Sequence, residues 1–137
     1  MADISAPANR VVSLGEALPL YLKNYAKFQG RSSRGAYWWS VLLLSIISIA
    51  ASVIDLTMFS ALVAQMGGTG PVGVIISLAT VIPSIAIAVR RLHDVGRSGW
   101  WYLIAFTVIG ILLLIYWWAQ PGQRQENAFG ADAEAGR

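Results

Sequence analysis

The feature that most constrains this chain is the absence of any lysine or arginine between Arg34 and Arg90, in a stretch dominated by aliphatic residues. One apolar run extends from Ala36 to Met66, and a second extends from Val72 to Val89. A helix of about 20 apolar residues crosses the hydrocarbon core of a bilayer. The first run is longer than one untilted span needs, so the pattern predicts membrane helices separated by a turn.

Composition agrees with a chain surrounded by hydrocarbon, because there are too few polar residues to cover a water-exposed surface. Of the 137 residues, 56% are hydrophobic and only 12% are charged, against a charged share of about 25% in soluble domains. The length allows one domain. The absence of cysteine excludes disulfides and thiolate ligands, and a single histidine argues against a histidine-based metal cluster. We therefore expect neither a metal nor another cofactor.

The pattern predicts an all-α integral membrane protein with about three transmembrane helices, preceded by an amphipathic interfacial helix. The expected order is a flexible leader at 1–12, a membrane domain at 13–120 and a polar tail at 121–137. Within the membrane domain, we place the amphipathic helix at 13–29 and the spans at about 37–56, 72–89 and 100–118. The glycine-rich sequence "GGTGP" is expected to form the turn between the first two spans.

The segment before the first span has the pattern of a helix that lies on a membrane surface. Ser13, followed three residues later by Glu16, is a capping-box pattern. Pro19 is expected to disturb the first turns. An apolar stripe recurs at spacings of three and four, with the lysines off it; it consists of Leu18, Leu22, Tyr25 and Phe28. Docking of this stripe against a partner domain is the competing interpretation.

Tryptophan pairs mark the ends of the predicted spans. Indole rings are amphipathic and prefer the headgroup level of a bilayer. We therefore expect interface anchors at Trp38, Trp39, Trp100, Trp101, Trp117 and Trp118.

The positions of the basic residues predict the orientation in the membrane. Lysines and arginines number five before the first span, none between the first two spans, three between the second and third, and two in the tail. The positive-inside rule then places the N-terminus and residues 90–99 in the cytoplasm. Three complete spans would leave the tail outside, whereas a bend at Gly110 would return it to the cytoplasm. The sequence leaves both arrangements open.

One charged stretch, "VRRLHDVGRSGWW" at 89–101, has two interpretations. As a helix junction, Arg90 and Arg91 end a helix and contact lipid phosphates, while Gly96 terminates the helix. As an active site, His93 and Asp94 would form an acid/base pair. Adjacent side chains on a helix diverge by about 100°, and no nucleophile or second carboxylate accompanies them. The junction is favoured, and we do not expect an enzyme.

Small and polar residues form a stripe on each of the first two spans. The first stripe consists of Ser45, Ser48, Ser52 and Asp55, and the second of Gly73, Ser77, Thr80, Ser84 and Ala88. Small residues let membrane helices approach closely, so we expect these faces to meet antiparallel, with Asp55 near Gly73 and Ser77. The alternative is a polar path in which Asp55 is a proton or cation site.

Three segments carry a resemblance to a known family. They are "FQGRSSRGAYWW" at 28–39, "IPSIAIAVRRLHDVGRSGWW" at 82–101 and "ENAFGAD" at 126–132. The chain resembles the domain of unknown function 805 family of bacterial inner-membrane proteins. The resemblance implies a protein of the bacterial cytoplasmic membrane with a few helices, and it supplies no catalytic residues. It implies only recurrent positions, which are Gly30, Arg31, Arg34, Tyr37, Trp38, Arg90, Arg91, Leu92, His93, Asp94, Gly96, Ser98 and Trp100.

The leading functional hypothesis is a non-enzymatic membrane component that binds anionic lipid, another membrane protein or a second copy of itself. The residues expected to bind are Arg31, Arg34, Arg90, Arg91, His93, Asp94 and Arg97. The alternative is a small oligomeric transporter or channel whose polar path is lined by Asp55 and the serine stripe. Nucleic acid is not an expected partner, because the cations cluster in loops instead of spreading along one face.

Overall fold

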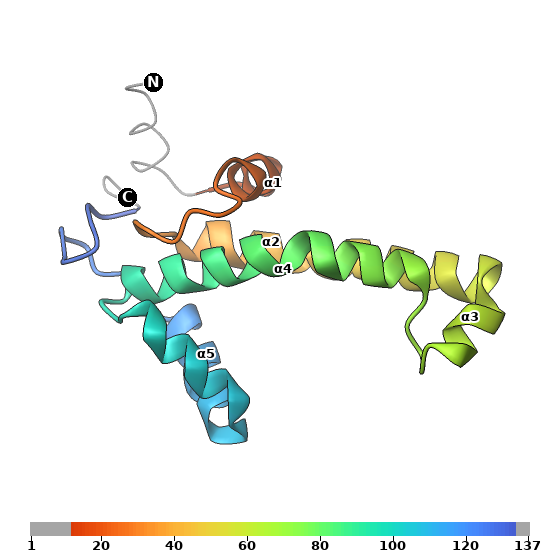
Figure 1. The fold of residues 1–137 in the computed structure, drawn as a ribbon. Coiled ribbons are helices and arrows are strands. Elements are labelled where there is room, and N and C mark those ends of the chain that lie inside the picture. The colour runs from red at the N-terminus through yellow and green to blue at the C-terminus, as the bar shows by residue number, and fades with distance from the viewer. Residues whose placement is uncertain (1–11, 134–137) are drawn as a thin grey trace.

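The computed structural model describes residues 12–133, and every extended regular element within them is helical. The predicted leader therefore lies outside the described residues, apart from Val12, as does the end of the tail. The elements in chain order are α1 (Leu14–Lys23), α2 (Arg34–Met58), α3 (Ser60–Gln65), α4 (Pro71–Asp94), the 3-10 helix η2 (Gly99–Phe106) and α5 (Val108–Ala119). Helices α2 and α4 form a long pair, α1 lies against one side of it, and α5 projects away from the other (Figure 1).

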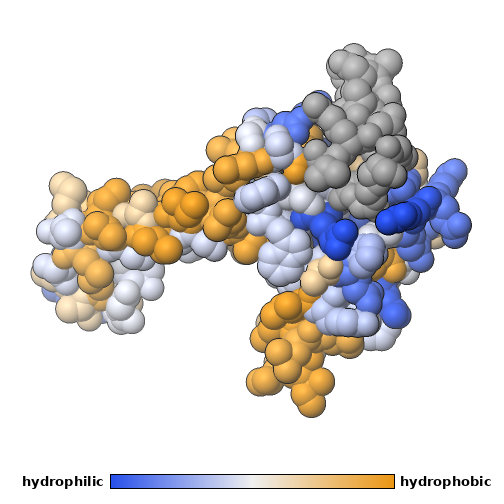
Figure 2. Space-filling view, turned by 180° about the vertical axis from the view of Figure 1, so that it is seen from behind, coloured by the Kyte–Doolittle hydropathy of each residue, from blue (hydrophilic) through white to orange (hydrophobic). Residues whose placement is uncertain are grey.

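Helices α2 and α4 are long and apolar enough to cross a membrane. At 1.5 Å per residue, their 25 and 24 residues reach about 36 Å, which exceeds a hydrocarbon core of roughly 30 Å. Only 11% and 22% of their most apolar windows are buried, so neither is the core helix of a water-soluble fold. Hydrophobic residues cover this pair and the α5 arm, whereas hydrophilic residues gather where the two arms meet (Figure 2).

Local capping explains where these helices begin and end. The Ser33 hydroxyl accepts a hydrogen bond from the Ala36 amide at 3.1 Å, which starts α2. Pro71 occupies the first turn of α4, where a missing N–H costs nothing. Gly96 ends α4 in the left-handed region, with φ of +77°, and the Arg97 amide bonds back to the Leu92 carbonyl. These residues fix the start of α2 and both ends of α4.

The third predicted span, at about 100–118, is a helical hairpin instead of one helix. Thr107 separates η2 from α5 with an extended backbone, φ −116° and ψ 148°. Helices η2 and α5 pack together as the two arms of this hairpin, and the ring centroids of Trp101 and Trp117 lie 5.5 Å apart. The 12 residues of α5 extend only about 18 Å, roughly half the hydrocarbon thickness. The chain therefore returns to the end of the α2–α4 pair from which it left, as in the bent arrangement that the sequence left open.

The bend occurs at Thr107, and Gly110 serves it by its lack of a side chain. The Thr107 hydroxyl accepts a hydrogen bond from the Gly110 amide at 3.0 Å and caps α5. A Cβ on Gly110 would lie well inside 3.0 Å of the Ile104 carbonyl oxygen. The close approach of the two arms therefore depends on glycine at this position.

Helix α1 begins as predicted but ends at Lys23 instead of residue 29. The Glu16 carboxylate accepts from the Ser13 amide at 3.0 Å, which completes the capping box. Pro19 lies inside the helix without ending it. Two members of the predicted stripe, Leu18 and Leu22, are exposed, as expected of a helix whose apolar face meets lipid. The last two stripe residues, Tyr25 and Phe28, lie beyond the helix end.

The opposite face of α1 holds the helix against the long pair. Ala17 and Tyr21 are buried there. The Tyr21 hydroxyl donates to the Thr80 carbonyl at 3.2 Å and shares a hydrogen bond with the Ser84 hydroxyl at 2.8 Å. Ser84, predicted to face α2, thus contacts α1 through its side chain, and Thr80 contacts α1 through its backbone carbonyl.

The predicted packing of two polar stripes holds only in part. Asp55 does contact Gly73: its Oδ2 accepts a hydrogen bond from the Gly73 amide at 2.8 Å. Ala88 is buried, as expected. However, Ser45, Ser48, Ser52 and Ser77 are exposed. The Ser45 and Ser52 hydroxyls bond carbonyls of their own helix one turn earlier, so they need no partner across an interface. The buried positions of α2 along the pair include Ser40, Ala51 and Asp55.

Candidate functional site

Five of the seven residues expected to bind a ligand lie together at one end of the α2–α4 pair. Three segments meet there: the loop between α1 and α2, the last turns of α4, and the tail after α5. The five residues are Arg31, Arg90, Arg91, His93 and Asp94. The other two lie apart. Arg34 is exposed in the first turn of α2, and Arg97 stacks on the Trp117 ring at 4.5 Å.

Asp94 is the centre of an ion-pair cluster with two arginines. Its Oδ1 lies 2.9 Å from Nη2 of Arg31, and its Oδ2 accepts from Nη1 of Arg91. All three side chains are at most 3% exposed. Buried charges are tolerated when they are paired and hydrogen-bonded. Here one carboxylate pairs with two guanidinium groups.

The remaining donors of the two arginines hold the tail. Arg31 donates to the carbonyls of Gln125 at 2.7 Å and Gly130 at 3.2 Å. Arg91 donates to the carbonyls of Trp118 at 3.0 Å and Gln120. The tail therefore lies on the same side of the molecule as the α1–α2 loop. These two arginines are engaged by the protein itself, which corrects their expected role as lipid contacts.

His93 contacts the tail through its ring and through its backbone carbonyl. The His93 ring stacks on Phe129, with ring centroids 4.2 Å apart. The Asn127 amide donates to the His93 carbonyl at 2.9 Å. Gly122 passes so close to Asp94 that a Cβ on it would lie well inside 3.0 Å of the carboxylate. His93 and Asp94 thus have separate partners and do not form the acid/base pair considered from the sequence.

Arg90 has a different environment from its neighbour Arg91. Its Nε donates to the Ser32 hydroxyl at 3.1 Å, and its Nη1 donates to the carbonyls of Asn24, at 3.2 Å, and Lys27. The residue is only 5% exposed. Among residues 12–133, no carboxylate pairs with it and no acceptor meets its Nη2. A buried cation held only by neutral oxygens leaves its charge uncompensated.

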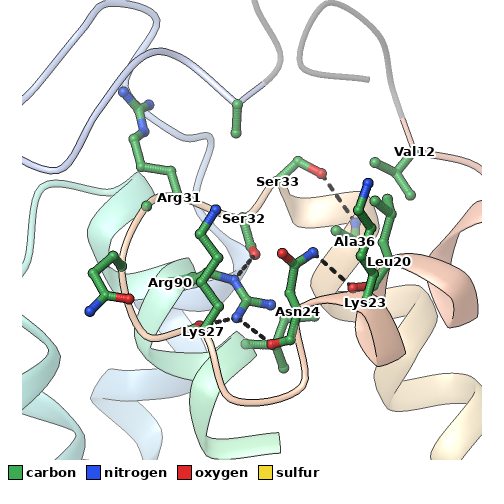
Figure 3. A pocket seen from close by; sticks show the side chains of 14 residues that line it. Val12, Leu20, Lys23, Asn24, Lys27, Arg31, Ser32, Ser33, Ala36 and Arg90 are labelled. Atoms are coloured by element: carbon green, nitrogen blue, oxygen red, sulfur yellow. Dashed lines mark hydrogen bonds between the residues drawn. The ribbon is translucent and has the colours of Figure 1, made fainter. Parts of the chain in front are cut away.

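This guanidinium lines a cavity of about 200 Å³ between the end of α1, the loop and the start of α2. Figure 3 shows Arg90, Lys23 and Lys27 around this space, with Ser32 and Ser33 between them. Neither lysine has a carboxylate partner within the described part of the chain. Apolar side chains complete the wall: Val12, Leu20, Ala36 and Ile87. The cavity therefore combines unpaired positive charge, hydroxyl groups and hydrocarbon.

Such a cavity has the chemistry to hold an anion attached to an apolar body. Lys23 and Lys27 were not among the residues singled out from the sequence. Their spacing of four, off the apolar stripe, is the signal that could have identified them, because the helix predicted over 13–29 would place both cations on one side. The contribution of Asn24, Ser32 and Ser33 depends on tertiary packing and has no sequence signal.

At the far end of the pair, the Asp55 side chain of α2 caps the N-terminus of α4, whose N-cap residue is Gly70. Its two oxygens accept from the amides of Val72, at 2.9 Å, and Gly73, at 2.8 Å. The side chain is buried and stabilised by the positive end of the helix dipole. Both carboxylate oxygens are therefore used to cap a helix, whereas the exposed serines of the stripe lie on the outer surface of the single chain.

The predicted tryptophan anchors divide into two groups. Trp38, Trp39, Trp100 and Trp101 are exposed, consistent with contact to an interface. Trp117 is buried, and Trp118 packs against Tyr37 with ring centroids 5.1 Å apart. The second pair is enclosed because the hairpin returns it to the helix junction, so it anchors the hairpin to the protein instead of to lipid.

Together, the two exposed apolar arms and the polar junction define an α-helical integral membrane protein. The chain belongs to the family described as Protein of unknown function (DUF805), whose profile matches residues 25–131. It is 37% identical over 117 residues to the inner membrane protein YhaI of Escherichia coli K12, covering 84% of this chain and 92% of that protein. It is also 37% identical over 114 residues to YhaH of the same strain, covering 81% and 90%. No solved structure matches.

Proposed function

We propose that this protein is a non-enzymatic component of the bacterial inner membrane that binds an anionic phospholipid by its phosphate. The observation that carries the proposal is the Arg90 guanidinium, buried in a cavity with Lys23 and Lys27 and without a carboxylate partner among residues 12–133. A phosphate oxygen would supply the missing acceptor and counter-charge. The apolar wall suits the attached lipid better than it suits a free ion.

The proposal also assigns an orientation. Because the cavity, the α1–α2 loop and the tail share one end of the molecule, their cations would all meet the same leaflet. The positive-inside rule makes this the cytoplasmic leaflet, where each cation near an anionic surface contributes about 1 kcal/mol to binding. Relatives named as inner membrane proteins support the choice of membrane.

The binding test replaces the two accessible cations of the cavity and spares the buried one. Lys23→Gln/Lys27→Gln should retain phosphatidylglycerol about tenfold more weakly than wild type, as measured by native mass spectrometry from nanodiscs. This loss corresponds to roughly 1.4 kcal/mol, within what two cations supply. Arg34→Gln is the matched control, because Arg34 is exposed and does not line the cavity, and it should weaken retention clearly less than the double variant does.

Two results would overturn the proposal. One is equal retention by the double variant and wild type. The other is binding of inorganic phosphate, without lipid, as tight as that of phosphatidylglycerol, which would make a free anion the ligand.

The orientation is tested separately with single cysteines, since the chain has none. Arg124→Cys, in the tail, should react with an impermeant maleimide only from the cytoplasmic side. Gln65→Cys, at the end of α3, should react only from the other side. Labelling of both from one side would contradict the proposed topology.

A further inference from the structure

A second cavity lies between α4 and η2, on a different face of α4 from the Arg90 cavity. It has a volume of about 420 Å³, within the range of roughly 300–1,000 Å³ typical of ligand pockets. Ile85, Val89 and His93 line it at spacings of four along one face of α4. The other walls consist of Phe28, Ser98, Gly99, Trp100, Tyr102 and Leu103. We call this space the hairpin groove.

The hairpin groove is polar at one end and apolar at the other. His93 and Ser98 lie beside the helix junction, whereas Ile85 lies eight residues earlier on α4, about 12 Å along its axis. Trp100 and Leu103, which border the groove, are 79% and 55% exposed. In a membrane, the groove therefore opens onto lipid and extends from the headgroup level into hydrocarbon.

His93 supplies an unused acceptor at the polar end. Its Nδ1 lies 2.8 Å from the Gly30 carbonyl oxygen, and a carbonyl only accepts, so Nδ1 carries the proton. In the neutral ring, Nε2 then has a free lone pair. Within residues 12–133 nothing bonds to Nε2, and the His93 side chain lines the groove.

We propose that the hairpin groove holds one acyl chain of phosphatidylethanolamine, whose ammonium group donates a hydrogen bond to Nε2 of His93. Because the groove opens onto the bilayer, the molecules that can enter its apolar end are lipid acyl chains. The acceptor at the polar end selects a headgroup with an N–H donor, which phosphatidylcholine lacks. This inference does not rest on the anion site, because it concerns another cavity and a lipid without net charge.

The first experiment measures headgroup preference. The protein is placed in nanodiscs that contain equal amounts of phosphatidylethanolamine and phosphatidylcholine with identical chains, and retained lipid is counted by native mass spectrometry. Wild type should retain phosphatidylethanolamine about fivefold over phosphatidylcholine, the effect of one hydrogen bond of roughly 1 kcal/mol. His93→Asn keeps an N–H for Gly30 and removes the Nε2 acceptor, so the preference should vanish. Loss of the stack on Phe129 should also lower the unfolding temperature, but the preference is a ratio of two lipids on the same variant and does not depend on that change.

A second pair of variants tests the groove itself. Ile85→Trp fills the apolar end and should abolish retention of the tightly held lipid. Leu78→Trp is the control, because Leu78 lies on the same helix, is 70% exposed and does not line the groove. Equal retention of the two headgroups by wild type would overturn the proposal. So would a preference that survives His93→Asn, or lipid retention that survives Ile85→Trp.

Discussion

The two ends of helix α4 each hold a buried aspartate, and they neutralise it in different ways. At the C-terminal end, Asp94 is paired with Arg31 and Arg91. At the N-terminal end, Asp55 accepts hydrogen bonds from two backbone amides, and no cation in the described part of the chain pairs with it. The first arrangement connects three chain segments through side chains, whereas the second joins two adjacent helices through the backbone. Charge at one end therefore organises tertiary structure, and charge at the other end only caps a helix.

The largest effect is expected from Asp94→Asn, which removes the charge shared by two buried arginines. Breaking a buried ion pair by removing one partner costs about 3–5 kcal/mol. The unfolding free energy in mixed detergent micelles should fall by that amount, and the tail should become sensitive to protease. A loss below about 1 kcal/mol would show that the two ends do not differ as the structure indicates.

Glycine-to-alanine substitutions test how tightly each carboxylate is enclosed. A Cβ at Gly122 would overlap Asp94, and one at Gly70 would overlap Asp55. Overpacking of this kind costs roughly 1–3 kcal/mol, so both variants should unfold at lower temperature. Gly15→Ala in α1 is the control, because nothing lies within 4 Å of its Cβ position. That variant should be neutral or slightly stabilised. Wild-type stability of both test variants would mean that the two carboxylates have room to move.

Asp55→Asn should have a smaller effect than Asp94→Asn. The amide oxygen still accepts one of the two backbone bonds, and the lost charge–dipole interaction is worth about 0.3–1 kcal/mol. The same unfolding measurement should therefore show a loss of roughly 1 kcal/mol. If the loss equals that of Asp94→Asn, the two ends are equivalent and the comparison fails.

Tyr21→Phe provides the reference between the two ends, since Tyr21 bonds Thr80 and Ser84 in the middle of α4. Loss of this neutral contact should cost about 1 kcal/mol or less. Burial raises the pKa of Tyr21 above its ordinary value of 10.0, so the folded state holds this proton more tightly than the unfolded state. Stability contributed by the protonated hydroxyl is therefore lost as the pH rises past about 10. Tyr21→Phe should reduce that loss in an unfolding series at increasing pH, and an unchanged pH profile would contradict it.

The sequence was sufficient to predict the helical membrane class, the two long spans and the cap at Ser13. Hydrophobic run length and capping residues act locally, so they can be read without a structure. The hairpin was left open for a physical reason. An apolar segment with tryptophans at both ends has the same pattern whether it is straight or bent at Thr107.

The sequence predicted where the arginines of the candidate site lie, but not which group each arginine binds. Arg31, Arg90 and Arg91 all cluster near the helix junction, as expected. Which arginine pairs with Asp94 and which remains without a carboxylate depends on how the tail folds back, and that contact links residues distant in sequence. The prediction that the serines of the first span pack against the second span was wrong for another reason. A serine hydroxyl that bonds a carbonyl of its own helix does not need a partner on a neighbouring helix.

The hairpin gives the molecule an uneven cross-section in the bilayer. Helices α2 and α4 are long enough to reach both leaflets, whereas η2 and α5 together reach only about half the thickness. With both long helices across the bilayer, one leaflet would make room for four helical segments beside α1, and the opposite leaflet for two with the short α3. A wedge of this shape fits best in a curved membrane whose convex leaflet is the one that holds the four segments.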